Sequence, residues 1–110
     1  MAYQVKKDSG FSVVHLTGDI DLSCSPEARK SILDSLAAAQ PTLVDLSAVT
    51  YIDSSGVASL VEGYQTAKKK NLEFGLLGVS EAALSVLELA RLDRVFPIYA
   101  SLKDRLAKNG

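Results

Sequence analysis

Asp53-Ser54-Ser55-Gly56 stands where a strand pattern gives way to a helical one. The run before it, residues 42–46, alternates in polarity and is rich in aliphatic and β-branched residues, as half-buried strands are. The apolar residues that follow recur at helical spacing: Val57, Leu60, Val61, Tyr64 and Ala67. The tetrapeptide is therefore predicted to be a turn that leads from a strand into a helix over residues 54–70.

The hydroxyl groups of this turn are candidates for a function that involves an anion. The first N–H groups of a helix lack partners within it and carry partial positive charge, so a phosphate on Ser54 or Ser55 is expected to be stabilised there. Asp and Ser are also common N-cap residues, which only accept a backbone hydrogen bond. One cap needs one of Asp53, Ser54 and Ser55, so one hydroxyl is expected to remain free for another role.

The bulk properties predict a single domain over residues 1–110. Hydrophobic residues make up 47% of the chain, and a net charge of -1 leaves no basic footprint for nucleic acid or anionic lipid. The lone thiol of Cys24 cannot form an internal disulfide, which favours a reducing, cytoplasmic location. No run is long and apolar enough to span a bilayer, so direct membrane insertion is not expected.

The remaining patterns predict alternating strands and helices. The expected strands cover residues 3–7, 11–17, 42–46, 72–77 and 93–99, with a break at 18–21. The expected helices cover residues 25–39, 54–70, 80–90 and 101–108, the first capped by Ser25 and the last with Leu102 and Leu106 facing inward. A hairpin followed by strand–helix–strand crossovers predicts an α/β sandwich with a mixed central sheet, antiparallel at its start and parallel in the remainder, and helices packed mainly on one face.

The segment from Val44 to Gly56 resembles the strand, loop and phosphorylation turn of the sulfate-transporter and anti-sigma-antagonist (STAS) domain family. Gly18-Asp19-Ile20-Asp21 resembles an earlier turn of that family, and Leu92-Asp93-Arg94-Val95-Phe96 resembles its segment before the last helix. The resemblance covers nearly the whole chain and implies a STAS-type sandwich.

What the resemblance implies is a partner switch of the bacterial anti-sigma factor antagonist type, with no catalytic role. The family's phosphorylated serine, directly after the aspartate, corresponds to Ser54. The unmodified chain is expected to bind an anti-sigma factor that is also a serine kinase, and so to release the sigma factor. Phosphorylation is expected to abolish binding until a serine phosphatase resets the chain. The expected partner-binding residues are Asp19, Asp21, Asp53, Ser54, Ser55, Gly56, Ser59, Glu62 and Gly63.

Two of these groups have alternatives. Turn chemistry alone would account for Asp19 and Asp21. Ser59, Glu62 and Gly63 are expected outside the apolar stripe of their helix, and Gly63 serves either the close approach of a partner or close packing within the domain.

Residues 57–62 depart from the antagonist pattern and resemble another STAS branch, the small cytoplasmic subunit of bacterial lipid-trafficking ABC transporters. This resemblance implies, as the alternative, an accessory subunit that binds the ATPase subunit, without need of a phosphorylated serine. A hydrolase would combine Ser54, His15 and an aspartate, but the turn lacks a Gly-x-Ser-x-Gly elbow and His15 is expected on an exposed strand position. No catalytic, metal or cofactor site is predicted.

Overall fold

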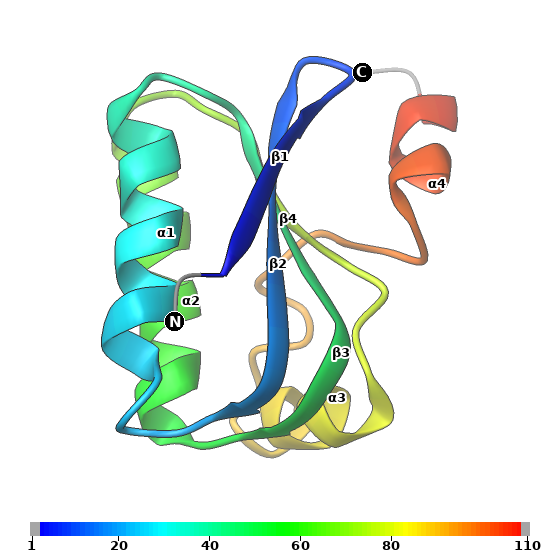
Figure 1. Cartoon of the computed structure of the whole chain (residues 1–110). Coiled ribbons are helices and arrows are strands. Elements are labelled where there is room, and N and C mark those ends of the chain that lie inside the picture. Colours follow the sequence, from blue (N-terminus) through cyan, green and yellow to red (C-terminus); the bar gives the residue numbers. More distant parts are fainter. Residues whose placement is uncertain (1–2, 109–110) are drawn as a thin grey trace.

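The computed structural model describes residues 3–108, which form one five-stranded sheet flanked by helices (Figure 1). The sheet runs in the order β1-β2-β3-β4-β5. β1 pairs antiparallel with β2, and every later pair is parallel, as predicted. The strands are β1 (Gln4–Asp8), β2 (Phe11–Ile20), β3 (Thr42–Ile52), β4 (Phe74–Leu77) and β5 (Ile98–Tyr99).

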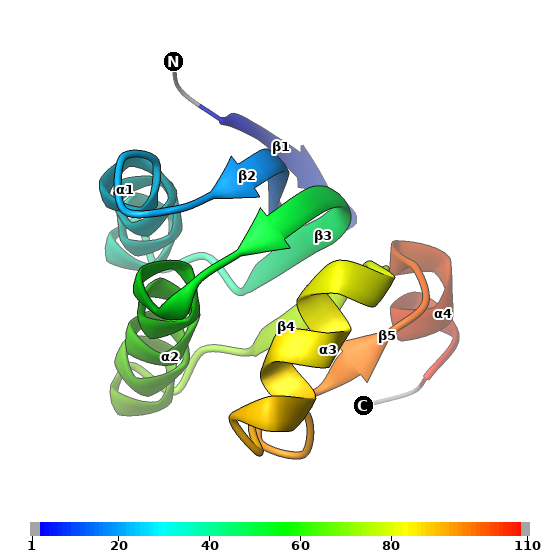
Figure 2. The ribbon, with the colours of Figure 1, turned by 90° about the horizontal axis from the view of Figure 1, so that it is seen from below.

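Helices lie unequally on the two faces of this sheet. Those on the larger apolar core are α1 (Ser25–Ala37), α2 (Ser54–Lys69) and α3 (Glu81–Leu89). The short α4 (Leu102–Ala107) covers a smaller cluster on the opposite face. Seen along the sheet, α1 and α2 lie next to each other on one side and α4 on the other (Figure 2). The expected sandwich with its helices mainly on one face is confirmed.

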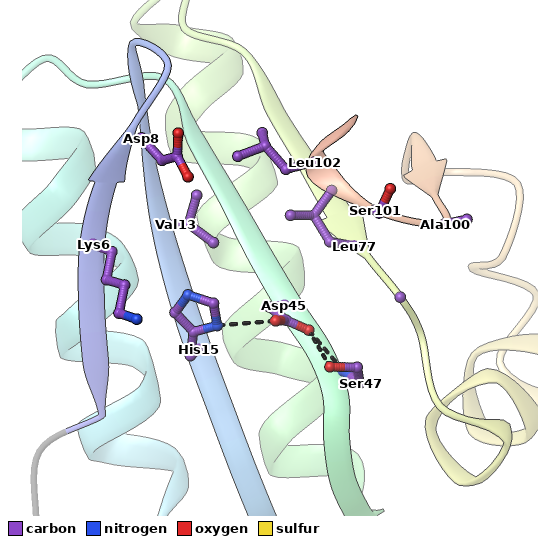
Figure 3. Close-up of a pocket in the computed structure, with 11 residues that line it drawn as sticks. Lys6, Asp8, Val13, His15, Asp45, Ser47, Leu77, Ala100, Ser101 and Leu102 are labelled. Carbon is purple, nitrogen blue, oxygen red and sulfur yellow. Dashed lines mark hydrogen bonds and ion pairs between the residues drawn. The ribbon is translucent and has the colours of Figure 1, made fainter. Parts of the chain in front are cut away.

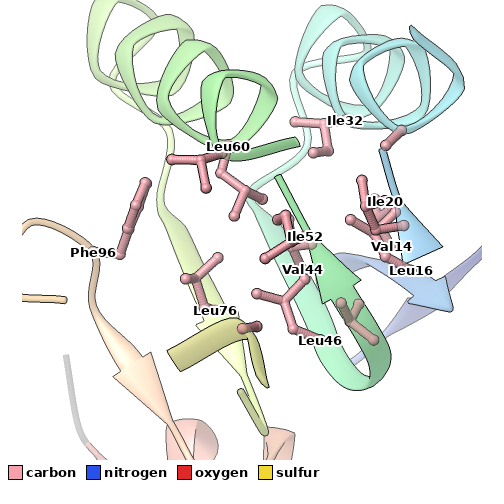
Figure 4. Close-up of a cluster of buried hydrophobic side chains, with 14 of the residues drawn as sticks. Val14, Leu16, Ile20, Ile32, Val44, Leu46, Ile52, Leu60, Leu76 and Phe96 are labelled. Atoms are coloured by element: carbon pink, nitrogen blue, oxygen red, sulfur yellow. The ribbon is translucent and has the colours of Figure 1, made fainter. Parts of the chain in front are cut away.

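The alternation of the central strands determines which side chains enter each core. Side chains on successive strand residues point to opposite faces. Val14 and Val44 therefore join the large core beneath α1 and α2 (Figure 4), whereas Val13 and Leu43 join the small cluster near α4. Each large aliphatic side chain removed from water contributes roughly 1.5–3 kcal/mol to folding. The burial of these side chains therefore determines which face of each strand is turned to the large core and which to the small cluster.

Both central strands are longer than predicted. Residues 18–21 were expected to break β2, but the strand continues to Ile20 through a register shift beside Gly18, whose φ is 72°. Glycine adopts that φ without strain, so the strand bends instead of ending. β3 likewise continues to Ile52, which pairs with Ile20. The strands predicted at 72–77 and 93–99 are shorter in the structure.

Three predicted helix details are wrong. Ser25 is the first residue of α1, and Cys24 occupies the N-cap without a side-chain hydrogen bond. The helix ends at Ala37, because Ala39 adopts a left-handed φ of 60°. In α4 the predicted inward position of Leu106 is wrong, since 45% of that residue is exposed.

Candidate functional site

The predicted turn lies at the carboxyl ends of two neighbouring parallel strands. The backbone N–H of Asp53 donates to the carbonyl of Ile20 (3.2 Å), which joins the end of β3 to the end of β2. α2 begins at the next residue, Ser54. Loops at the carboxyl ends of parallel strands are where α/β sheets place their binding sites, so the fold brings the turn to a position suited to recognition.

Asp53 is the N-cap of α2. Its carboxylate oxygen Oδ1 accepts hydrogen bonds from the N–H groups of Ser55 (2.9 Å) and Gly56 (3.2 Å) and from the hydroxyl of Ser55 (2.6 Å). The hydrogen bond from the Ser55 hydroxyl holds the pKa of Asp53 below its ordinary value; burial opposes it, and the backbone N–H groups of Gly56, Ser55 and Leu22 lower the pKa further. The cap is therefore an ionised carboxylate.

Ser54 is the residue that this network leaves out. It is exposed, and its side chain forms no hydrogen bond within residues 3–108. The hydroxyl predicted to remain free of capping is therefore that of Ser54. Two of the donors expected to stabilise an anion here are, however, already in use, because the N–H groups of Ser55 and Gly56 donate to the Asp53 carboxylate.

The two acids from the end of β2 lie on the same rim. Asp19 is exposed and accepts a hydrogen bond from the hydroxyl of Thr50 in β3 (2.7 Å). Asp21 accepts from the N–H (3.0 Å) and the hydroxyl (2.6 Å) of Ser23, and these bonds lower the pKa of Asp21, although burial and the charge of Asp53 oppose them. Asp19, Asp21 and Asp53 thus make this end of the molecule acidic.

Two exposed apolar side chains on this rim were missed from the sequence. Leu22 is 74% exposed, and its backbone N–H faces the Asp53 carboxylate. Tyr51 is 51% exposed and pairs with Asp19 across β2 and β3. Leu22 stands between two polar residues and belongs to no strand or helix pattern, and this isolation could have indicated from the sequence that its side chain is exposed. Tyr51 could have been found only by extending the strand alternation through Ile52.

Three residues predicted to contact a partner are buried within the domain instead. A Cβ at Gly56 would lie 2.6 Å from Ile52 Cγ1 and 2.8 Å from the carbonyl oxygen of Ile20. Ser59 is 5% exposed and donates to the carbonyl of Ser55 (3.2 Å). The expectation that Ser59 lies outside the apolar stripe of its helix is wrong, and Gly56 is buried as well.

Gly63 is also buried, so its predicted place outside the apolar stripe is wrong. A Cβ there would lie 2.7 Å from Ile32 Cγ2 of α1 and 2.9 Å from Phe74 Cε1 of β4. Close packing of helices within the domain, the alternative reading of this glycine, is what the structure shows. Glu62 does lie at the surface, where both its oxygens accept from Arg29 of α1 (2.6 and 2.7 Å).

The residues that a hydrolase would need are not brought together. His15 Nδ1 lies 2.9 Å from Asp45 Oδ2, on the sheet face opposite α1 and α2. Ile52 lies seven residues beyond Asp45 along β3, a length of about 23 Å, so Ser54 is far beyond hydrogen-bond reach of His15. Within residues 3–108 no group of His, Cys, Asp and Glu is placed to hold a metal ion, and no helix is long and apolar enough to cross a membrane.

Comparisons with known proteins agree on one family. The STAS domain family model matches residues 2–105. The anti-sigma-F factor antagonist RsfB of Mycobacterium tuberculosis (strain H37Rv) is 28% identical over 106 residues, 93% of this chain and 84% of RsfB. A crystal structure of an anti-sigma factor antagonist from Mycobacterium paratuberculosis is 32% identical, with a TM-score of 0.86 over 96% of this chain and 91% of that one. The unphosphorylated form of the anti-sigma factor antagonist SpoIIAA shares the fold, with a TM-score of 0.80 at 18% identity over 96% and 93% of the two chains.

Proposed function

The chain belongs to the STAS domain family, and from this premise we propose that it is an anti-sigma factor antagonist switched by phosphorylation of Ser54. In this proposal the unmodified chain binds an anti-sigma factor that is also a serine kinase, and the bound sigma factor is released. Phosphorylation of Ser54 ends the complex, and a serine phosphatase restores it. The chain itself performs no catalysis and acts in the cytoplasm, where its lone thiol stays reduced.

The observation that carries this proposal is the isolation of one hydroxyl. The Ser55 hydroxyl donates a hydrogen bond to the Asp53 carboxylate, whereas Ser54 is exposed at the start of α2. A kinase can therefore reach the Ser54 oxygen without unfolding the helix. The exposed Leu22 and Tyr51 supply apolar contact area on the same rim, and tyrosine is one of the residue types enriched among those that carry most of the binding energy of protein interfaces.

The charge of the rim gives phosphorylation its effect. A phosphoryl group adds roughly -1.5 to -2 charges, and it would enter beside the ionised carboxylates of Asp53 and Asp21. Because the Asp53 carboxylate already accepts from the N–H groups of Ser55 and Gly56, the helix end offers fewer donors to offset the new charge. It remains on the surface, where it alters both the shape and the potential that a partner meets.

The relatives support the choice of partner class. RsfB and the 32% identical protein of known structure are both named as antagonists of anti-sigma factors. SpoIIAA, of the same fold, is described in an unphosphorylated form, which supports a modification of that protein. The proposed contacts with the anti-sigma factor are made by residues of this rim and the start of α2: Asp19, Asp21, Leu22, Tyr51, Asp53, Ser54, Ser55 and Glu62.

The test measures binding of purified variants to the anti-sigma factor kinase from the same genome by calorimetry. Ser54→Ala is expected to bind as the wild type does, and Ser54→Asp to bind at least about tenfold more weakly. Ser9→Asp is the matched control, because it adds the same charge at the exposed β1–β2 turn, at the opposite end of β2. Equal binding by Ser54→Asp and the wild type would refute the switch.

The alternative, an ABC transporter accessory subunit, predicts a different result from the same variants. The chain would then co-purify with an ATPase subunit, and Ser54→Asp would leave that complex intact. Recovery of an anti-sigma factor instead, with loss of the complex on Ser54→Asp, would exclude the transporter role.

A further inference from the structure

A cavity of about 290 Å³ opens on the sheet face opposite α1 and α2 (Figure 3). It lies between β1, β2 and β3 on one side and the segment from β5 into α4 on the other. None of the residues proposed to bind the anti-sigma factor lines it. The lining consists of Lys6, Asp8, Val13, His15, Asp45, Ser47, Leu77, Gly78, Ala100, Ser101 and Leu102.

Lys6 brings an unpaired positive charge to this cavity. It pairs with Val13 across β1 and β2, so both side chains stand on the cavity face. Its ammonium group forms no ion pair within residues 3–108. The next residue, Lys7, points to the other face of the strand, where it lines a groove beside α1. A single cation is therefore available on this side of β1.

His15 stands next to Lys6 with one ring nitrogen held in place. Its Nδ1 lies 2.9 Å from Asp45 Oδ2, and the other oxygen of Asp45 accepts from the N–H (2.9 Å) and hydroxyl (2.7 Å) of Ser47. A carboxylate bonded to Nδ1 fixes the ring orientation and leaves Nε2 for a further partner. Asp45 thus orients the imidazole, and the cavity contains a cation beside an oriented ring.

The opposite wall is apolar. Val13 and Leu77 are both 4% exposed and form the floor, and Leu102 of α4 closes the side (Figure 3). Gly78 allows the end of β4 to lie close to Ser47 of β3, because a Cβ at Gly78 would lie 3.2 Å from Ser47 Cβ. The cavity therefore has a polar side at Lys6 and His15 and an apolar side at Leu77 and Leu102.

We propose that this cavity binds a small monocarboxylic acid with an apolar body. The carboxylate accepts hydrogen bonds from Lys6 Nζ and from the Nε2–H of protonated His15, and the apolar body packs on Val13, Leu77 and Leu102. Lys6 forms no ion pair within residues 3–108 and can offset one negative charge, whereas a phosphate dianion would add a second negative charge to a cavity that already holds Asp8 and Asp45. The volume is at the small end of ligand cavities, which restricts the ligand to a short chain or a single ring.

The charged groups around the His15 ring come from two strands. Lys6 and Asp8 of β1 and Asp45 of β3 line the cavity, and the wall from β4 to α4 contributes no charged side chain to it.

The experiment is a titration of the whole ¹⁵N-labelled chain with hexanoate, followed by backbone amide NMR shifts. Saturable shifts are expected at His15, Leu77 and Leu102, with hexylamine of the same length producing none. Lys6→Gln and His15→Gln are each expected to weaken hexanoate binding by about tenfold, the loss of one charge-assisted hydrogen bond. Lys7→Gln is the matched control and should bind as the wild type does.

Three results would overturn the proposal: no saturable shift, equal binding of hexylamine, or an unchanged affinity in Lys6→Gln. Because Lys6 is exposed, its substitution leaves the core intact, and a folded amide spectrum confirms this before each titration. None of these readouts involves the anti-sigma factor, so the result is independent of the switch at Ser54.

Discussion

Arg105 of α4 binds both carboxylate oxygens of Glu73, the residue that precedes β4. The same guanidinium lies 5.1 Å from the ring centre of Phe11 and 6.0 Å from that of Tyr99. α4 contains no buried residue, and Leu106, expected from the sequence to anchor it, is largely exposed. The planar guanidinium of Arg105 therefore attaches α4 to the sheet, through its ion pair and its contacts with aromatic rings.

Replacing Arg105 is expected to detach α4 while the rest of the domain stays folded. In Arg105→Ala, the amides of α4 should lose hydrogen-exchange protection, and those of β2 and β3 should retain theirs. Lys103→Ala, which removes an exposed cation from the same helix, is the control and should exchange as the wild type does. Unchanged exchange in α4 of Arg105→Ala would show that another contact holds the helix.

The two helical glycines of α2 are expected to differ in their tolerance of a methyl group. Gly63→Ala should cost roughly 1–3 kcal/mol through overpacking, partly offset by about 1 kcal/mol of helix propensity. The atoms nearest to that methyl group belong to the side chains of Ile32 and Phe74, which can shift more readily than backbone atoms. Gly56→Ala should cost more, because the backbone carbonyl of Ile20 lies 2.8 Å from the new Cβ and cannot move easily. Urea unfolding of both variants measures the order, and a larger cost for Gly63→Ala would contradict it.

Asp45 is expected to contribute to acid unfolding. Burial raises the pKa of this carboxyl, but hydrogen bonds from Ser47 and His15 outweigh burial and hold the pKa below the ordinary 3.8. A carboxyl whose pKa is lower in the folded state contributes stability above its unfolded pKa and loses it as the pH falls through the folded value.

The free energy of unfolding should therefore fall as the pH drops below about 4, and Asp45→Asn should show a shallower fall over that range. Urea unfolding at a series of pH values measures both slopes. Asp34→Asn, which removes an exposed carboxyl of α1, controls for the change in net charge. Identical acid slopes for Asp45→Asn and the wild type would exclude this role.

Leu22 and Tyr51 are expected to be binding residues with little effect on folding. Both are more than half exposed, so Leu22→Ala and Tyr51→Ala should leave the melting temperature nearly unchanged. Each should weaken binding to the anti-sigma factor by about tenfold if its side chain enters the interface. Leu106→Ala, an exposed apolar truncation on α4, is the control. Wild-type affinity in both rim variants would place the partner on another surface.

The charge of Asp53 should add to the effect of a charge on Ser54. Asparagine caps helices about as well as aspartate, so Asp53→Asn is expected to preserve α2. Combined with Ser54→Asp, it should restore part of the affinity for the anti-sigma factor that Ser54→Asp alone loses. A double variant as weak as Ser54→Asp would show that steric fit, not charge, breaks the complex.

The mixed sheet, the order of helices and a helix start at the turn of residues 53–56 could be predicted, because these depend on local patterns, whereas such patterns leave open the choice of Asp53 over Ser54 and Ser55 as the cap. Alternation identifies a strand, and an acid before a helical stripe identifies its start. The helix expected from residue 80 likewise has Ser80 as its N-cap, which accepts from the N–H of Ala83.

The parts that failed depend on tertiary contacts. The burial of Ser59 and Gly63 is decided by how closely α1 approaches α2, which the pattern of α2 alone does not contain. The continuation of β2 past Gly18 depends on pairing with β3. The pairing of Arg105 with Glu73 joins residues 32 apart in sequence, so no local pattern indicated that this arginine faces inward.

The hydrogen bond between Ser55 and Asp53 has a consequence for regioselectivity. Two chemically identical hydroxyls stand side by side in the chain, yet one is tied to a carboxylate at 2.6 Å and the other is not. An enzyme that modifies this turn therefore does not have to distinguish adjacent serines by its own active site. The fold of the substrate itself leaves only the Ser54 hydroxyl free. Replacing Asp53 by a residue that cannot accept a hydrogen bond would release the Ser55 hydroxyl as well, so that Ser54 and Ser55 would compete for modification.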